Sequence, residues 1–425
     1  MVAGRMCSGG QPPVRETTVV VGAPWRINDP EVEGAVYVFE RQTEGPWLET
    51  ARLLGAPNDH DPSRYEYFGW SVALHGHTLA IGATDDYDDN GLRKGALYVF
   101  VRDPNGLWRE ADRLLGDGGN FGDSVAIYGD TIVVGAPEDD PFGFASGSAY
   151  VFERDPNGGW LQTAKLLPHD GHSLQFFGKA VAVHGEVVLA GAELDRLDGE
   201  FTGAVYVYER RPAKGWSQTA RLVASDAANA DAFGSAIAVD GTLAVIAARF
   251  HDGVALNGGA AYVFARAAGG AWLEVARLQP PDLGDRDEFG RSVALSGNLA
   301  VVGAPFHDVV DSDGNTQVDA GAAYVFAVGP DRDENGVMDV CECRAAVGAL
   351  GEGFVANPDL DLDGEVDLDD LLILLSNFGR DRDNLPAGHS PPSAALHEYG
   401  DLDLDQDIDL ADLAFMLAAY DRACE

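Results

Sequence analysis

The sequence predicts a multidomain protein in which a long all-β domain precedes a small α-helical module. Two observations predict this division. A β-type pattern recurs at a near-constant interval through residues 17–328, where no helical periodicity appears. Two aspartate-rich segments near the end of the chain each run into a leucine-rich stretch with helical spacing. The 425 residues are enough for two or more domains.

A repeated unit fills the first three quarters of the chain. The dipeptide Phe-Gly recurs at a nearly constant interval, at Phe68, Phe121, Phe177, Phe233 and Phe289. Each copy continues through a Gly turn and an apolar strand to a Gly-x-x-Tyr-Val segment, which occurs six times. A tryptophan opens the last segment of five copies, at Trp47, Trp108, Trp160, Trp216 and Trp272. Fixed spacing of this kind is typical of repeat architectures.

Each unit is predicted to contain four short strands. In the clearest copy these cover residues 124–128, 131–134, 149–153 and 160–167, and Gly129-Asp130 makes a two-residue turn between the first two. In the last strand, simple alternation would place Trp160 and Leu166 on one face. Four antiparallel strands in each repeat predict the blade of a β-propeller. We expect the repeated Phe, Trp and Tyr side chains to pack between blades rather than bind a ligand.

The repeated pattern resembles the FG-GAP repeat family, which is related to the propeller of integrin α-chains. The resemblance implies a ring of six or seven blades of extracellular type, used for adhesion or ligand recognition. The family's calcium loop between the first two strands is replaced by two-residue turns such as Gly76-His77 and Gly185-Glu186. Residues 1–16 are expected to be disordered. The first copy lacks its Phe-Gly strand and the last lacks its tryptophan strand, so we expect upstream sequence to be missing, with seven blades as an alternative count.

Two acidic loops predict calcium binding in residues 345–425. An EF-hand loop places oxygen ligands at positions 1, 3, 5, 7, 9 and 12, the seventh through a backbone carbonyl. Residues 359–370 supply Asp359, Asp361, Asp363, Glu365, Asp367 and Asp370 at these positions. Residues 401–412 supply Asp401, Asp403, Asp405, Asp407, Asp409 and Asp412, with Gln406 in place of the usual glycine.

The paired loop–helix units resemble the type I dockerin module. The resemblance implies calcium-dependent folding and docking to a cohesin partner in secreted polysaccharide-degrading complexes. Dockerins that bind cohesins often carry a Ser-Thr pair at loop positions 10 and 11, where this chain has Leu368-Asp369 and Leu410-Ala411. Whether the partner is a cohesin therefore stays open. A third loop, in the linker of residues 329–344, fits the same template, with a flexible acidic linker as the alternative. Its ligands are Asp331, Asp333, Asn335, Val337 (carbonyl), Asp339 and Glu342.

Composition favours an extracellular or cell-surface protein. The formal net charge of −40 disfavours nucleic acid and anionic membranes as partners. No apolar run is long enough to span a membrane, and no signal peptide is visible. Calcium loops of modest affinity need the calcium of an extracytoplasmic compartment. A disulfide from Cys341 or Cys343 to Cys424 would close the C-terminal module, with free cysteines as the alternative.

The function predicted from these features is ligand recognition or adhesion by the propeller, with attachment to a protein partner through the tail. No nucleophile elbow, zinc-protease, P-loop or dinucleotide-binding pattern occurs. A propeller active site built from several loops stays open, which makes a polysaccharide-active enzyme the alternative. Blade loops carry carboxylates that either line one face of the ring or are simply solvated: Asp139, Asp140, Asp195, Asp252 and Asp308.

Overall fold

The computed structural model describes residues 2–3, 18–24, 34–41, 47–55, 66–87, 91–211, 214–310 and 316–328. All of these belong to the first of two compact units, residues 1–338. The three predicted calcium loops, the three cysteines of the predicted disulfide and the dockerin-like module lie outside the described residues.

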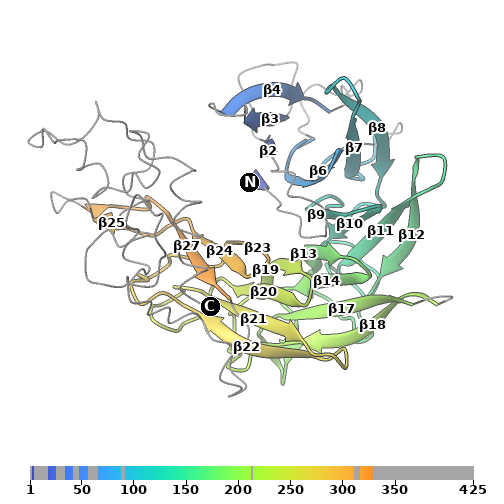
Figure 1. Ribbon diagram of the computed structural model, residues 1–425. Helices are drawn as coiled ribbons and strands as arrows, with labels where there is room; N and C mark the ends of the chain where they lie inside the picture. The colour runs from blue at the N-terminus through green and yellow to red at the C-terminus, as the bar shows by residue number, and fades with distance from the viewer. Residues whose placement is uncertain are drawn as a thin grey trace, which may run out of the picture. The chain divides into compact units, whose positions relative to one another are not determined.

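The described residues form six antiparallel sheets that follow one another along the chain (Figure 1). The first contains β1 (Val2–Ala3), β2 (Thr18–Ala23), β3 (Ala35–Arg41) and β4 (Trp47–Leu53). The second contains β5 (Ser71–His75), β6 (Thr78–Ala83), β7 (Ala96–Arg102) and β8 (Trp108–Leu115). The third contains β9 (Ser124–Tyr128), β10 (Thr131–Ala136), β11 (Ser148–Arg154) and β12 (Trp160–Leu166).

The remaining sheets repeat this plan with one exception. The fourth contains β13 (Phe177–His184), β14 (Val187–Ala192), β17 (Ala204–Arg211) and β18 (Gly215–Leu222). The fifth contains β19 (Phe233–Asp240), β20 (Leu243–Ala248), β21 (Ala260–Arg266) and β22 (Trp272–Leu278). The sixth has three described strands, β23 (Ser292–Ser296), β24 (Leu299–Ala304) and β27 (Ala322–Ala327). Two small ribbons lie in loops: β15 (Arg196–Leu197) with β16 (Glu200–Phe201), and β25 (Val309–Val310) with β26 (Thr316–Gln317).

Each sheet is a propeller blade. We call its four strands, from the inside outward, the Phe-Gly strand, the Gly-Ala strand, the tyrosine strand and the tryptophan strand, and Figure 1 shows them fanning outward in this order. At four places the glycine before a tyrosine strand makes a parallel bridge to the phenylalanine of the next sheet, as between Gly203 and Phe233 or Gly259 and Phe289. The described residues therefore form a six-blade β-propeller.

The core lies in the seams between successive sheets. All five Phe-Gly phenylalanines are buried, with at most 1% of the residue exposed. Each meets the aromatic side chains of its own tyrosine strand edge to face, as Phe233 does with Tyr262 at 5.5 Å between ring centroids and with Phe264 at 6.0 Å. This arrangement of ring edge against ring face is the preferred one for aromatic pairs. The predicted packing role of these phenylalanines and tyrosines is confirmed.

Most of the strand prediction is confirmed, and no helix occurs among the described residues. The two-residue turns lie where they were expected, since His75 pairs with Thr78 and Tyr128 with Thr131. The predicted shared face of Trp160 and Leu166 is wrong. A β-bulge shifts the register between Val151 and Phe152, so that Trp160 pairs with Arg154 while Leu166 pairs with Ala149. The extra residue of a bulge reverses the alternation beyond it.

The start of the first sheet differs from the prediction that residues 1–16 are disordered. Val2 and Ala3 lie within the segment expected to be disordered, and they pair with Val21 and Val20 of β2. Val72 and Ala73 of β5 hold the equivalent places beside β6. A two-residue strand thus occupies part of the Phe-Gly strand position in the first sheet.

Candidate functional site

A polar cluster recurs beside the tyrosine strand of each sheet from the second to the sixth. In every case the tyrosine hydroxyl donates to a nearby aspartate, at 2.7–3.2 Å. The tyrosines are Tyr98, Tyr150, Tyr206, Tyr262 and Tyr324. We call these groups the seam clusters. Their aspartates lie either in the loop before the tyrosine strand, as Asp86, Asp139 and Asp195 do, or in the loop that leads into a Phe-Gly strand, as Asp226 and Asp282 do.

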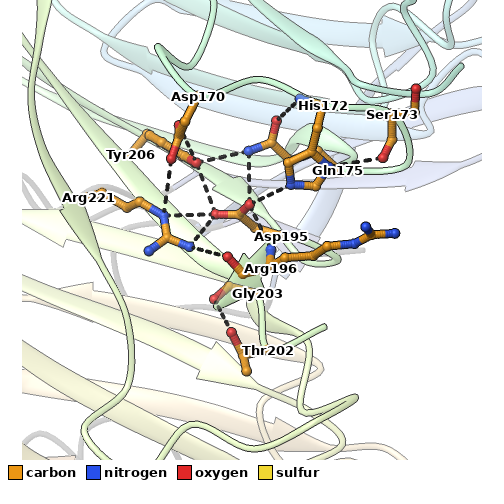
Figure 2. Close-up of polar contacts among 10 residues, drawn as sticks. All are labelled: Asp170, His172, Ser173, Gln175, Asp195, Arg196, Thr202, Gly203, Tyr206 and Arg221. Atoms are coloured by element: carbon orange, nitrogen blue, oxygen red, sulfur yellow. Dashed lines mark hydrogen bonds and ion pairs between the residues drawn. The ribbon is translucent and has the colours of Figure 1, made fainter. Parts of the chain in front are cut away.

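The seam cluster of the fourth sheet is the most extensive (Figure 2). Its centre is Asp195, which follows β14 and is 2% exposed. Asp195 Oδ2 accepts from the Tyr206 hydroxyl at 2.9 Å and from Arg221 Nε at 2.9 Å. Asp195 Oδ1 accepts from Gln175 Nε2 at 3.1 Å and from its neighbour's backbone N–H at 2.8 Å, and lies 3.0 Å from His172 Nε2.

Electrostatics favours the charged form of Arg221 and the protonated form of Tyr206. Burial opposes the positive charge of Arg221, but the nearby carboxylate of Asp195 outweighs burial and raises the pKa of the guanidinium. Burial, with the charges of Asp195 and Asp170, raises the pKa of the Tyr206 hydroxyl. The tyrosine therefore stays protonated and acts as a donor. Because both carboxylate oxygens of Asp195 already accept several hydrogen bonds, the cluster anchors its loops and leaves that carboxylate little capacity to act as a general base.

The seam clusters of the second and third sheets also combine an aspartate with a tyrosine and a cationic side chain. Asp86 is fully buried, accepts from the Tyr98 hydroxyl at 2.8 Å and makes a two-point contact with Arg113 at 2.5 and 3.1 Å. Such two-point guanidinium–carboxylate pairs are strong and directional. In the third sheet, Lys165 Nζ takes the place of arginine, 2.7 Å from Asp139.

The fifth and sixth sheets carry histidine where the others carry aspartate. His251 and His307 occupy the loop position of Asp195, and each faces an aspartate at the Gln175 position. The Nδ1 atom of His251 lies 3.1 Å from Asp231 Oδ2, and that of His307 lies 2.6 Å from Asp287 Oδ2. Hydrogen bonding to Asp231 raises the pKa of His251, against the opposing effect of burial. In these two sheets the acidic residue therefore lies at the Gln175 position, a histidine lies at the Asp195 position, and the tyrosine is retained.

Exposed apolar side chains gather on the same loops. We define the loop face as the connections from Gly-Ala strand to tyrosine strand (residues 84–95, 137–147, 193–203, 249–259 and 305–321, where described) and those that lead into each Phe-Gly strand. Phe144 is 73% exposed, Phe142 43% and Leu174 38%. Leu174 N–H donates to the Phe144 carbonyl at 2.7 Å, so a backbone hydrogen bond joins the two loops that carry these side chains. Other exposed apolar residues of the loop face are Leu92, Val254, Leu256, Phe306 and Val318.

The loop conformation that presents Leu174 is itself repeated. Leu174 and Phe176 have positive φ angles of 63° and 56°, and Ala230 and Ala232 repeat this at the next seam with 72° and 57°. Non-glycine residues rarely adopt this region, and it persists only where surrounding structure enforces it. The seam hydrogen bonds of the Leu174 and Phe176 backbones supply that enforcement.

The predicted site residues divide into two groups. None of the predicted calcium ligands lies among the described residues. Within the described part, no three His, Cys, Asp or Glu side chains converge in a way that could hold a metal ion. The five blade-loop aspartates are described, and their carboxylates are engaged locally. Asp139 and Asp195 join seam clusters, while Asp140, Asp252 and Asp308 accept backbone N–H groups within their own loops.

The seam clusters were not anticipated from the sequence, although a signal was present. In the second to fifth sheets the repeated tyrosine is preceded at a nearly constant interval by an aspartate or histidine, and followed at a constant interval by a cation. These cations are Arg113, Lys165, Arg221 and Arg277. Packing of the tyrosine ring is enough to explain the spacing of this residue. Its hydroxyl and the matched cation could be connected only once the two outer strands were paired in register.

Comparison with known proteins agrees with the fold. The described residues include no helix with the length and hydrophobicity needed to cross a membrane. No curated protein matches the chain. The FG-GAP repeat family matches at residues 47–100, 111–152, 160–208, 216–264 and 272–326, which together make up more than half of the chain. Each match starts within a tryptophan strand and ends in the tyrosine strand of the next sheet. The chain therefore belongs to the FG-GAP repeat family.

Proposed function

We propose that this protein is an extracellular recognition or adhesion protein whose propeller binds its ligand at the loop face. The observation that carries the proposal is the exposed group of Phe142, Phe144 and Leu174 on a rigidly anchored seam. Exposed apolar groups rimmed by polar residues are typical of interaction sites. Aromatic side chains are also enriched at the centres of interfaces. The neighbouring His172, with 31% of its side chain exposed, supplies a polar edge.

The rigidity of the seam supports this proposal. A ligand that meets a preformed surface does not have to order it, so less of the interaction energy is lost on binding. The hydrogen bonds of Asp195 to Gln175 and Arg221 link the loops that flank the apolar group. The FG-GAP propeller fold is consistent with such a role, and the ligand class is left to experiment.

The test is binding of the full chain to a panel of immobilised polysaccharides and extracellular matrix proteins. We expect saturable retention without product release. The double variant Phe144→Ser, Leu174→Ser is expected to weaken retention at least tenfold. The matched control is Leu161→Ser, Leu273→Ser, because both leucines are 57% exposed on tryptophan strands away from the loop face. Equal retention by both variants would refute ligand binding at the loop face. Release of soluble sugars would favour a polysaccharide-active enzyme instead.

We further propose that residues 345–425 form a calcium-folded module that attaches the propeller to a protein partner, with a cohesin-like domain as the first candidate. The support is the ligand pattern of residues 359–370 and 401–412, in which carboxylates recur at alternate positions. The third loop, residues 331–342, is proposed to stiffen the linker in the same way. Co-purification of the full chain with a cohesin domain in calcium, and its loss in chelator, would support this attachment. Equal recovery with and without calcium would count against it.

A further inference from the structure

His172 lies between two hydrogen-bond acceptors at the edge of the loop face (Figure 2). Its Nδ1 atom is 3.0 Å from the Ser173 carbonyl oxygen, and its Nε2 atom is 3.0 Å from Asp195 Oδ1. A carbonyl oxygen can only accept a hydrogen bond. Asp195 Oδ1 already accepts from Gln175 Nε2 and from the Arg196 N–H, so it acts as an acceptor here as well. Both ring nitrogens of His172 therefore face accepting oxygen atoms.

Only the doubly protonated ring satisfies both of these contacts. The imidazolium form of histidine has two N–H donors, whereas the neutral form has one N–H and one lone pair. In the neutral form of His172 a lone pair would face an oxygen atom at 3.0 Å, so one of the two contacts would be lost. Because a carboxylate is a stronger acceptor than a carbonyl, the contact to Asp195 is the one expected to persist. The contact to the Ser173 carbonyl is the one expected to be lost.

The Ser173 carbonyl belongs to the peptide group that leads into Leu174. The N–H of the same peptide group donates to the Phe144 carbonyl at 2.7 Å. Leu174 has a positive φ of 63°, a backbone conformation that persists only where surrounding contacts enforce it. Loss of the His172 contact would remove a hydrogen bond from one side of this peptide group. The loop that presents the exposed Leu174 side chain would then be held less firmly.

The side chain of His172 is specific to the seam that exposes the apolar group. Five residues before the Phe-Gly phenylalanine, the third, fifth and sixth sheets have Gly116, Ala228 and Gly284. The backbone N–H of Ala228 and that of Gly284 donate at 2.8 Å to the aspartate at the Gln175 position. His172 keeps this backbone bond, to Gln175 Oε1 at 3.3 Å, and adds a titratable ring that is 31% exposed. Among the described seams, only the one with the exposed apolar group has such a ring here.

Several ionisable groups surround His172, and they ordinarily titrate outside the neutral range. These groups come from the loop of His172 itself, from the loop after β14, and from β17 and β18 (Figure 2). The loop of residues 137–147 also packs on this loop, since a Cβ on Gly171 would meet the Phe142 ring. The side chains concerned are Asp170, Gln175, Asp195, Tyr206 and Arg221, with Asp139, Asp140 and Lys165 on the facing side. Carboxyl, phenol, guanidinium and ammonium groups ordinarily titrate outside about pH 5.5–8, whereas histidine titrates within this interval.

We infer that His172 is a pH-dependent switch of the loop face. In its protonated form the ring fixes the Ser173–Leu174 peptide group and keeps the apolar group preformed. Release of the Nδ1 proton to solvent frees this peptide group, with no covalent change. Because a preformed surface loses less interaction energy on binding, the ligand should be retained more strongly at pH 5.5 than at pH 8.0. This inference rests on the proposed function, since it concerns regulation of the same site.

The first test is hydrogen exchange at the Leu174 amide of the full chain. Protection is compared at pH 5.5 and pH 8.0 after correction for the intrinsic pH dependence of exchange. It should fall at least fivefold at pH 8.0. In His172→Gln the fall should be less than twofold, because a glutamine amide donates equally at both pH values. His169→Gln is the matched control and should keep the full effect, since this exposed histidine lies in the same loop and its backbone N–H contacts Gln218.

The second test is retention on the panel of polysaccharides and extracellular matrix proteins at the same two pH values. Retention should be at least fivefold weaker at pH 8.0, and this difference should disappear in His172→Gln and persist in His169→Gln. Equal protection of the Leu174 amide at both pH values, or a fall that persists in His172→Gln, would overturn the switch. Retention that does not change with pH would overturn its control of binding. Absence of retention at any pH would instead refute the proposed function, and hydrogen exchange would still decide whether His172 fixes the peptide group.

Discussion

The carboxylate of Asp195 is almost completely buried and is surrounded by hydrogen-bond donors. Removing a buried ion from water costs several kcal/mol, and that cost is offset only when the charge is paired and its lone pairs are satisfied. Asp195 meets this condition through Tyr206, Arg221 and Gln175. The stabilisation therefore comes from the cluster as a whole. Without the charge of Asp195, the partly buried Arg221 would lack its counter-ion, which destabilises the fold.

We predict that Asp195→Asn lowers the free energy of unfolding by about 2–4 kcal/mol, because an amide NH₂ would face groups that are all donors and Arg221 would lose its counter-ion. The measurement is urea unfolding followed by tryptophan fluorescence. Asp198→Asn in the same loop is the control, since Asp198 is exposed and asparagine tolerates its positive φ of 53°. A loss below about 1 kcal/mol would mean that the cluster does not anchor the seam.

His251 makes the fifth sheet sensitive to pH. Its imidazole is surrounded by Asp231 at 3.1 Å, Asp226 at 3.8 Å and the more distant guanidinium of Arg277, and its ring lies 6.2 Å from that of Tyr262. Hydrogen bonding to Asp231 raises the pKa of His251 above the ordinary value of 6.5. A raised pKa means that the charged pair stabilises the fold fully below pH 6.5 and that this stabilisation is lost as the pH rises through the folded-state pKa.

We therefore predict that His251→Gln destabilises the propeller by about 1–3 kcal/mol at pH 6, and that the deficit shrinks by pH 9. Thermal melts of both proteins across this range would show it. The exposed His169→Gln serves as the control, because it leaves the His251–Asp231 pair intact. A deficit for His251→Gln that is constant from pH 6 to pH 9 would contradict the assignment of a charged His251–Asp231 pair.

At the scale of elements, the seam between two sheets depends on backbone contact at glycine. Gly191 of β14 lies against the backbone of Gly234, and a Cβ there would collide with the Gly234 carbonyl oxygen. The same place in the fifth sheet holds Ala247, whose Cβ would lie 2.9 Å from one on Gly290, so a seam adapts to a single methyl group. A branched side chain adds more volume than the seam can accept, because packed interiors absorb little added volume.

We predict that Gly191→Val separates the fourth and fifth sheets locally and costs about 2–3 kcal/mol. Gly269→Ala is the control, because its Cβ would meet open space and its φ is in the ordinary range. Hydrogen exchange at Phe233 and Ser235 would report the seam directly, since both amides donate within or across it. Unchanged protection of these amides in Gly191→Val would mean that the glycine contact does not hold the sheets together.

The strands could be predicted from the sequence because local patterns determine them, and the seams could not. Two-residue turns such as Gly129-Asp130 and the six Gly-x-x-Tyr-Val segments mark strand ends and strand faces within a few residues. The bulge opposite Val151 and Phe152 depends on pairing with a neighbouring strand, so alternation alone placed Trp160 on the wrong face. The cluster around Asp195 joins residues from Asp170 to Arg221, which converge only when the loop that leads into the fourth sheet folds against the paired strands of that sheet.

For the whole molecule, the governing quantity is a formal net charge of −40. Self-repulsion at such a charge destabilises compact states. Within the propeller, carboxylates such as Asp86 and Asp139 are neutralised by Arg113 and Lys165. The predicted calcium loops of residues 359–370 and 401–412 each hold six acidic residues among their predicted ligands and few nearby cations. Divalent ions are the neutralising charges that the sequence predicts there.

We predict that the full chain binds at least two calcium ions per molecule and that chelation removes a separate unfolding transition while leaving that of the propeller in place, because metal-binding energy becomes folding energy where no site is preformed. Calorimetric titration and differential scanning calorimetry with and without EDTA would measure this. The variant Asp363→Asn, Asp405→Asn should lose binding at least tenfold, whereas Asp252→Asn, in a described propeller loop, should not change it. Calcium-independent melting of the full chain would rule out a calcium-folded tail, and the case for an extracytoplasmic protein would then depend on the propeller alone.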